Sequence, residues 1–267
     1  MEKDLGEKDS LGFDAVVAGK NPEESAVVYR AAHPEEILTA MEDFDVLMMR
    51  YDSAIREVRT KLEILNDELS LTMDSSPISS IVSRRKKPLS IYEKLIRQNN
   101  EISLESIKKN LNDVAGIRVI CSFVDDIYKV AKMLVQQDDI KLIQVKDYIK
   151  NPKDNGYRSY HMIVEVPVFF SSEVQPMRVE VQIRTVAMDF WASLEHKIRY
   201  KKDLPKEKLD QIATELKSCA DTIADTDMRM LAIREKIGPV SEKSVSGRGA
   251  FETHLKPVMP RKERNRE

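Results

Sequence analysis

The stretch VAGIRVICSF, which spans residues 114–123, decides the fold class that we expect for this chain. Its β-branched and other apolar residues are typical of a buried strand. A helical pattern follows at about 126–136, and three further strands are expected after it. A strand, a helix and then consecutive strands indicate one crossover connection followed by antiparallel pairing. We therefore predict an α+β protein with a mixed sheet.

Helical patterns surround these strands along the sequence. Ser90 and Glu93 have the spacing of a capping box, and Thr185 is placed to cap the helix that follows it. The predicted strands cover residues 78–83, 114–123, 140–149, 158–168 and 177–185. The predicted helices cover residues 34–70, 90–98, 103–111, 126–136, 186–200 and 206–237. The expected architecture is a mixed sheet of about five strands surrounded by helices, with long N- and C-terminal helices.

The chain divides into three parts by composition. Residues 1–33 are glycine-containing with little periodicity, which predicts a flexible N-terminal extension. Residues 34–237 carry all of the periodic segments and are expected to form the folded domain. Residues 238–267 are polar and end in RKERNRE, which predicts a disordered tail.

Bulk composition indicates a soluble protein with a heavily charged surface. The 267 residues are 42% hydrophobic and 33% charged, with no apolar run of membrane-spanning length and no signal-peptide pattern at the start. The two cysteines, Cys121 and Cys219, do not form a disulfide framework. We therefore expect a cytoplasmic location. A net charge of −2 argues against a protein that binds nucleic acid through overall charge.

Positive charge is instead concentrated locally. The segment SRRKKP, residues 83–88, contains Arg84, Arg85, Lys86 and Lys87 immediately before a predicted helix. Such a run is usually a solvated surface or a linker. Its position at a helix start makes phosphate binding the alternative interpretation.

Residues 146–161 read KDYIKNPKDNGYRSYH and combine turn residues with cations and tyrosines. The Asn155-Gly156 pair is a strong hairpin signal, so the window taken alone favours a β-hairpin. The alternative is a loop that holds a nucleotide, with aromatic faces for the base and cations for the phosphates. The cations are Lys146, Lys150, Lys153 and Arg158, and the tyrosines are Tyr148, Tyr157 and Tyr160.

Two acids are candidates for chemistry. Along residues 177–185, Val179, Val181 and Ile183 are predicted to face one side of the strand, whereas Arg178, Glu180, Gln182 and Arg184 face the other. Glu180 is either part of a solvated sheet edge or an acid–base or metal group. Asp113 precedes the strand at 114 and either ends the preceding helix or binds Mg²⁺ together with Glu180. Zinc is not expected, because the cysteines and histidines lack ligand spacing.

These parts suit phosphoryl chemistry, which depends on positioning and charge neutralisation. The sequence contains neither a P-loop motif nor a kinase-type glycine loop, so side chains must hold the phosphates. Two other classes stay open. One is a catalytically inactive nucleotide- or RNA-binding module, and the other is a nucleotidyltransferase, although the Asp-x-Asp pairs of this chain lie in helical patterns.

Four linked stretches carry a resemblance to a known family. The chain resembles the RelA/SpoT-type (p)ppGpp synthetases, and in particular the stand-alone small alarmone synthetases of the RelQ type. The resemblance covers roughly residues 35–237 and implies a nucleotidyltransferase-like synthetase fold. The four stretches are SRRKKPLSIYEK (83–94), DVAGIRVICSFVDDI (113–127), KDYIKNPKDNGYRSYH (146–161) and VEVQIRTVAMDFWASLEHKIRYK (179–201).

The resemblance implies a reaction and roles for particular residues. The β,γ-diphosphate of ATP would be transferred to the 3′-hydroxyl of GTP or GDP, giving AMP and (p)ppGpp. Asp113 and Glu180 would bind Mg²⁺, and Glu180 would also activate the 3′-hydroxyl. The residues expected to bind ATP are Arg84, Lys86, Ser90, Lys94 and Arg118. The residues expected to bind the acceptor nucleotide are Lys146, Lys153, Asn155, Tyr157, His161 and Gln182, with Tyr157 stacked on guanine and with Tyr148 and Tyr160 left to packing.

The resemblance also bears on partners and regulation. A homotetramer built through the terminal helices is expected. The sequence has no His-Asp dipeptide and no room for long C-terminal regulatory domains, so synthesis without hydrolysis is expected. The sequence does not decide among GTP, GDP and GMP, nor whether (p)ppGpp acts as an allosteric ligand or RNA binds.

Overall fold

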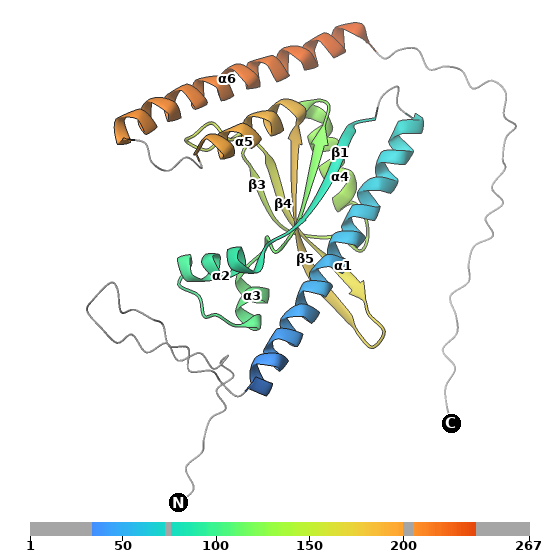
Figure 1. Cartoon of the computed structure of the whole chain (residues 1–267). Helices are drawn as coiled ribbons and strands as arrows, with labels where there is room; N and C mark the ends of the chain where they lie inside the picture. The colour runs from blue at the N-terminus through green and yellow to red at the C-terminus, as the bar shows by residue number, and fades with distance from the viewer. Residues whose placement is uncertain (1–33, 73–75, 200–204, 239–267) are drawn as a thin grey trace, which may run out of the picture.

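The computed structural model describes residues 34–72, 76–199 and 205–238 (Figure 1). The flexible extension predicted at 1–33 lies outside these residues, as does the predicted tail beyond Gly238. The helices are α1 (Pro34–Thr72), α2 (Pro88–Arg97), α3 (Leu104–Asn110), α4 (Val124–Val135), α5 (Val186–Arg199) and α6 (Lys206–Ile237). The strands are β1 (Ile78–Arg85), β2 (Ala115–Cys121), β3 (Lys141–Asp147), β4 (Tyr160–Phe169) and β5 (Val174–Thr185).

The five strands form one mixed sheet in the order β1-β2-β5-β4-β3. The central pair, β2 and β5, is parallel, whereas β1 with β2, β4 with β5 and β3 with β4 are antiparallel. The predicted crossover through α4 leads from β2 to the edge strand β3, and the predicted antiparallel pairing of β3, β4 and β5 follows it. The α+β prediction with a five-stranded mixed sheet and long terminal helices is confirmed.

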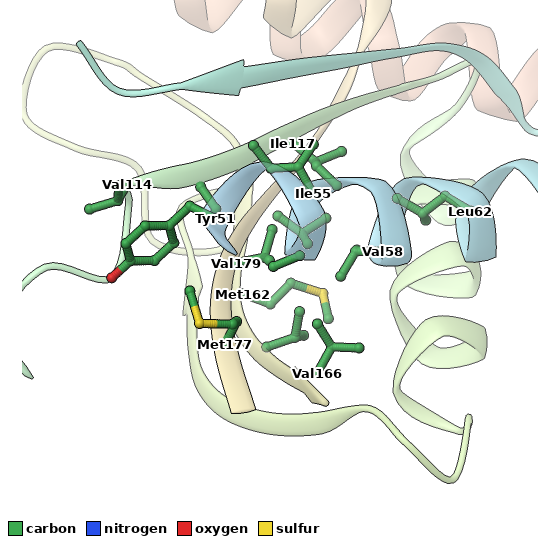
Figure 2. Close-up of a cluster of buried hydrophobic side chains, with 14 of the residues drawn as sticks. Tyr51, Ile55, Val58, Leu62, Val114, Ile117, Met162, Val166, Met177 and Val179 are labelled. Atoms are coloured by element: carbon green, nitrogen blue, oxygen red, sulfur yellow. The ribbon is translucent and has the colours of Figure 1, made fainter. Parts of the chain in front are cut away.

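One face of the sheet forms the hydrophobic core. The long helix α1 crosses this face and places Tyr51, Ile55 and Val58 against strand residues such as Ile117 and Val179 (Figure 2). Val58, Val179 and Val181 are completely buried. Burying a side chain of this kind contributes about 1.5–3 kcal/mol. This apolar face holds the sheet against α1 and leaves the alternate strand residues for the opposite face.

The first residues of α5 and α2 can be compared with the helix caps predicted at Thr185 and Ser90. Thr185 accepts a hydrogen bond through its Oγ1 from the backbone N–H of Met188 at 3.0 Å, so the predicted cap of α5 is confirmed. The capping box predicted at Ser90 is wrong, because α2 begins at Pro88, with Lys87 as its N-cap. Proline suits the first turn since it has no N–H to leave unpaired there. Ser90 consequently lies inside the first turn.

The C-terminal helices pack at the end of the sheet where β5 finishes (Figure 1). α5 follows β5 directly, and α6 lies across α5 and α4 (Figure 1). Of the helices that the structure describes, none is both long enough and apolar enough to cross a membrane. Cys121 is buried and Cys219 is exposed, and both are free thiols.

Candidate active site

Sheet register brings the candidate residues from all five strands to the face opposite α1. Gly116 of β2 pairs with Glu180 of β5, and Arg84 of β1 pairs with Gly116. One row along, Arg118 pairs with Gln182. Directly paired residues point to the same side of a sheet, so these side chains share a face. The second row continues through His161 of β4 to Lys146 of β3.

Asp113 lies at the centre of the part of this face that we call the ATP half. It sits in the segment between α3, which ends at Asn110, and β2. The interpretation of Asp113 as the end of a helix is therefore wrong. Its Oδ2 accepts a hydrogen bond from Lys86 Nζ at 2.8 Å, and its Oδ1 lies 2.8 Å from Lys94 Nζ. The end of β1 and the helix α2 thus deliver two cations to one carboxylate.

These lysines keep Asp113 ionised. Burial alone would raise the pKa of Asp113, but hydrogen bonds and charge from Lys86 and Lys94 outweigh burial and hold it below its usual value. An ionised carboxylate beside two ammonium groups is a site at which anionic phosphates can compete for the cations.

Arg84 and Arg118 differ in how they are held. Arg84 is exposed at the end of β1. Arg118 is half-buried and pairs with Asp189 of α5 through its Nη1 at 3.2 Å. Burial and the neighbouring charge of Arg184 lower the pKa of Arg118, although Asp189 counteracts them. Ser90, in the first turn of α2, is half-buried on the same side as Lys94 of that helix.

The acceptor half of the face is a connected hydrogen-bond network. Tyr157 places its hydroxyl 2.8 Å from His161 Nε2. His161 Nδ1 lies 3.3 Å from Glu180 Oε1. Gln182 donates from Nε2 to Glu180 Oε2 at 2.8 Å. A continuous path therefore joins the predicted guanine-stacking ring to the predicted general base.

Glu180 is also held ionised. Burial raises its pKa, as does the charge of Asp113, but the hydrogen bond and charge of His161 and the hydrogen bond from Gln182 bring the pKa below its usual value. An ionised carboxylate that keeps a hydrogen-bonded imidazole is suited to accept a proton from a substrate hydroxyl.

Aromatic rings and a lysine gather at the loop of residues 148–159, which joins β3 to β4 and which we call the acceptor loop. Lys153 Nζ lies 4.7 Å from the ring centroid of Tyr148 and 4.9 Å from that of Tyr157. Tyr148 also contacts His161 edge-on at 5.2 Å between centroids. Tyr148 was expected only to pack, but it belongs to this cluster. Tyr160 does pack, edge-on against Tyr128.

Asn155 shapes the acceptor loop. Its Oδ1 accepts from the backbone N–H of Tyr157 at 3.2 Å, and its Nδ2 donates to Glu195 of α5 at 3.2 Å. Because β3 and β4 pair on either side of this loop, the hairpin interpretation is confirmed. The hairpin carries at its tip the residues proposed for the nucleotide, so the two interpretations are compatible.

Two residues that the sequence reasoning missed connect the halves. Arg184 is only 4% exposed, lies 5.0 Å from the Tyr157 ring centroid and donates to the Tyr157 hydroxyl. Asp189 accepts from Arg184 at 3.1 Å and also pairs with Arg118. The alternation of residues along β5 already placed Arg184 on the face of Glu180, and this was the one sequence signal that could have identified it. Asp189 offered none beyond its position in the first turn of α5.

The donor set fits a hard divalent cation only in part. Across residues 34–72, 76–199 and 205–238, no group of three or more His, Cys, Asp or Glu side chains could hold a metal ion. Asp113 and Glu180 share the face and supply carboxylate oxygens, the donors that Mg²⁺ prefers. Substrate phosphates would have to supply the remaining ligands, as is usual for this ion.

Comparison with known proteins places this site in a family. Residues 83–204 match the model described as the region found in RelA / SpoT proteins. The GTP pyrophosphokinase YwaC of Bacillus subtilis is 43% identical over 207 residues, which cover 77% of this chain and 97% of that protein. This chain belongs to the RelA/SpoT family.

Solved structures of the family share the fold of this RelA/SpoT protein. The small alarmone synthetase 2 of Bacillus subtilis superposes with a TM-score of 0.65 at 42% identity and covers 73% of this chain and 99% of its own. The small alarmone synthetase 1 of that organism, bound to its product pppGpp, gives 0.67 at 34% identity and covers 74% and 99%. The matched region contains every candidate site residue of this chain.

Proposed function

We propose that this RelA/SpoT protein is a GTP pyrophosphokinase that transfers the β,γ-diphosphate of ATP to the 3′-hydroxyl of GTP or GDP. The products are AMP and (p)ppGpp. The proposal rests on two ionised carboxylates, Asp113 and Glu180, that share one face of the sheet. Lysines lie beside Asp113, and the aromatic acceptor loop lies on the side of Glu180.

ATP binds on the side of Asp113 in this proposal. Lys86 and Lys94 exchange Asp113 for phosphate oxygens, and Ser90 in the first turn of α2 adds a hydroxyl donor. Arg84 and Arg118 present guanidinium planes to the adenine. Asp113 and Glu180 would hold Mg²⁺, which when bound neutralises the phosphate charge.

The acceptor nucleotide binds on the side of Tyr157. The Tyr157 ring stacks on guanine, and Lys146 and Lys153 attract the acceptor phosphates. Glu180 accepts the proton of the 3′-hydroxyl as that oxygen bonds to the β-phosphorus of ATP. The bond between this phosphorus and the bridging α,β-oxygen breaks, and AMP leaves with the electron pair.

His161 and Gln182 position the base. Both hydrogen-bond to Glu180, so they fix the orientation of its oxygens while leaving it ionised. Gln182 also accepts from Arg184 at 2.8 Å, which ties its amide to a buried cation.

Product identification tests the reaction. The full chain is incubated with ATP, GTP and Mg²⁺, and the nucleotides are separated. AMP together with pppGpp is expected. Pyrophosphate in place of AMP would mean nucleotidyl transfer, and unchanged nucleotides would mean a binding module; either result overturns the proposal.

A homotetramer through the terminal helices is part of the proposal. Exposed apolar side chains on α1 and α6 support it, because association through these helices would remove them from water. They are Leu38, Met41, Val46, Met49, Ile64 and Leu71 on α1, and Leu209, Met228, Met230, Ile233 and Ile237 on α6. Light scattering after size-exclusion chromatography should give a molar mass four times the 30.7 kDa of one chain.

A further inference from the structure

The acceptor loop has a second surface that faces away from the nucleotide side and rests on α6. Figure 1 shows α6 running across the end of the molecule that carries α5. Gly156 and Arg158 of the loop line a small pocket together with Trp191 of α5 and Ala220 of α6. The reaction proposed above uses neither Gly156 nor Arg158.

Arg158 connects the loop to α6 through two acceptors on the helix and donates to a third acceptor within the loop. Its Nη1 donates to the backbone oxygen of Gly156 at 3.1 Å and to that of Ala220 at 3.2 Å. Its Nη2 donates to Asp221 Oδ1 at 2.9 Å. A guanidinium with several donors in a fixed plane can hold a loop and a helix in one geometry, which a single hydrogen bond cannot.

Gly156 makes the approach to α6 close. Its φ of +88° lies in the region that favours glycine, and a Cβ added there would lie 2.7 Å from the Ala220 Cβ. Ala220 is only 3% exposed. The loop and α6 therefore pack backbone against helix, with no side chain between them that could absorb a change in spacing.

The helix beneath the loop is itself anchored. Trp191 Nε1 donates to the backbone oxygen of Leu216 at 2.8 Å, and Thr185 donates to Asp227 Oδ2 at 2.6 Å. Near its C-terminal end, Arg234 pairs with Asp125 of α4. With α6 fixed to α5, to the end of β5 and to α4, it is a rigid support for the loop.

We infer that Arg158 is a positioning residue for the acceptor nucleotide: it holds the acceptor loop on α6 and so sets the orientation of the neighbouring Tyr157 ring. This inference rests on the proposed function. Arg158 acts through Tyr157 and is expected to affect the guanine nucleotide much more than ATP, because its hydrogen-bond partners are Gly156, Ala220 and Asp221, none of which belongs to the ATP half.

The test is steady-state kinetics of the full chain with each nucleotide varied in turn. Arg158→Gln should raise KM for GTP about tenfold, with KM for ATP nearly unchanged. Arg158→Lys keeps a charge for Asp221 but loses the planar fork, so its effect should be intermediate, as should that of Asp221→Asn. Asp225→Asn is the matched control: it lies four residues further along α6, its side chain is 70% exposed and it pairs with Arg229 of the same helix.

A fluorescence readout separates positioning from mere stabilisation. Trp191 is the single tryptophan of the chain and borders the same small pocket. Its emission should change when GDP is added to wild type and to Asp225→Asn, and about tenfold more GDP should be needed in Arg158→Gln. This binding readout does not depend on turnover.

The outcomes are separable. A lower melting temperature with an unchanged KM for GTP would show a purely structural role and overturn the inference, as would equal effects on both substrates. Wild type that makes no AMP and pppGpp would instead overturn the proposed function. A normal wild type beside a selective defect in Arg158→Gln supports both.

Discussion

On the ATP half, Lys86 and Lys94 both reach the carboxylate of Asp113, whereas on the acceptor half Tyr157, His161 and Gln182 form a hydrogen-bonded path to Glu180. The first arrangement joins full charges. The second joins mostly neutral groups that are half-buried and backed by the buried Arg184. The two nucleotide sides of one sheet face are thus held by different forces.

This difference has consequences for substitutions. Ion partners on the ATP half can be exchanged for phosphates without moving the backbone, so changes there should act on charge and little on stability. Groups on the acceptor half are bound to one another and to α5, so changes there should affect both nucleotide binding and stability. The following experiments test this contrast, from the largest expected effect to the smallest.

Asp113→Asn should reduce turnover by at least about 10²–10³-fold, because the amide keeps the shape of the side chain and loses the charge. Melting should stay within about 5 °C of wild type, since an amide at this position still accepts a hydrogen bond from Lys86 or Lys94. Glu93→Gln, on the exposed side of α2, is the control for loss of one acid. An Asp113→Asn variant with substantial turnover would show that the assignment of Asp113 is wrong.

Tyr157→Ala should weaken GTP by about 1–3 kcal/mol, the range for removal of a base-stacking ring, and leave KM for ATP nearly unchanged. Tyr157→Ala and Tyr157→Phe both leave Arg184 without one of its acceptors, so both should melt lower. The measurements are KM for each nucleotide and the melting temperature of each variant. An equal rise in KM for GTP and for ATP would contradict the stacking role.

Arg84→Ala and Arg118→Ala should each weaken ATP by about 0.5–2 kcal/mol, because each loses a stacking plane. The structure separates them in stability. Arg118 is half-buried and pairs with Asp189, whereas Arg84 is exposed, so only Arg118→Ala should lower the melting temperature. If GTP were weakened as much as ATP in either variant, the assignment of the two nucleotide sides would be wrong.

Asp227→Asn should stabilise the chain slightly at neutral pH. Burial raises the pKa of Asp227, although the hydrogen bond from Thr185 opposes this, so the folded state favours the protonated form. Stability from that form is present below the unfolded pKa of 3.8 and is lost as pH rises through the folded pKa. The advantage of the variant should therefore disappear in urea melts near pH 3.5, and an advantage independent of pH would contradict the mechanism.

The fold was predictable from the sequence because the strands carry β-branched or alternating apolar residues and the long helices carry a broad apolar stripe. Val179, Val181 and Ile183 alternate so strictly with polar residues that their face of β5 was predictably the core face. Pairing partners were not predictable in the same way. The parallel contact of β2 with β5 joins segments far apart in the chain, and no local pattern encodes which strand neighbours which.

The candidate site was predictable only where a motif or a lone acid marked it. Asp113, Glu180 and Tyr157 stood out in this way, and their roles came from family resemblance. The strand pattern left the face of Arg184 open between a solvated edge and a site, and the residue is buried because α5 and the acceptor loop supply its partners. Ser90 was misplaced as a cap because Pro88 could begin the helix two residues earlier. The burial of Arg184 depends on tertiary neighbours that the local sequence does not contain.

The parallel pairing of β2 with β5 also decides when the site can come into existence. Asp113 precedes β2, but Glu180 lies on the strand that is synthesised last, after α4 and the hairpin of β3 and β4. Non-local pairs of this kind form slowly, since a long loop must close before they contribute. A nascent chain that has emerged only as far as β4 would hold its lysines and Asp113 without the opposing carboxylate. Alarmone synthesis would then begin only after residues well beyond Thr185 have emerged from the ribosome, so an unfinished chain is expected to be inactive.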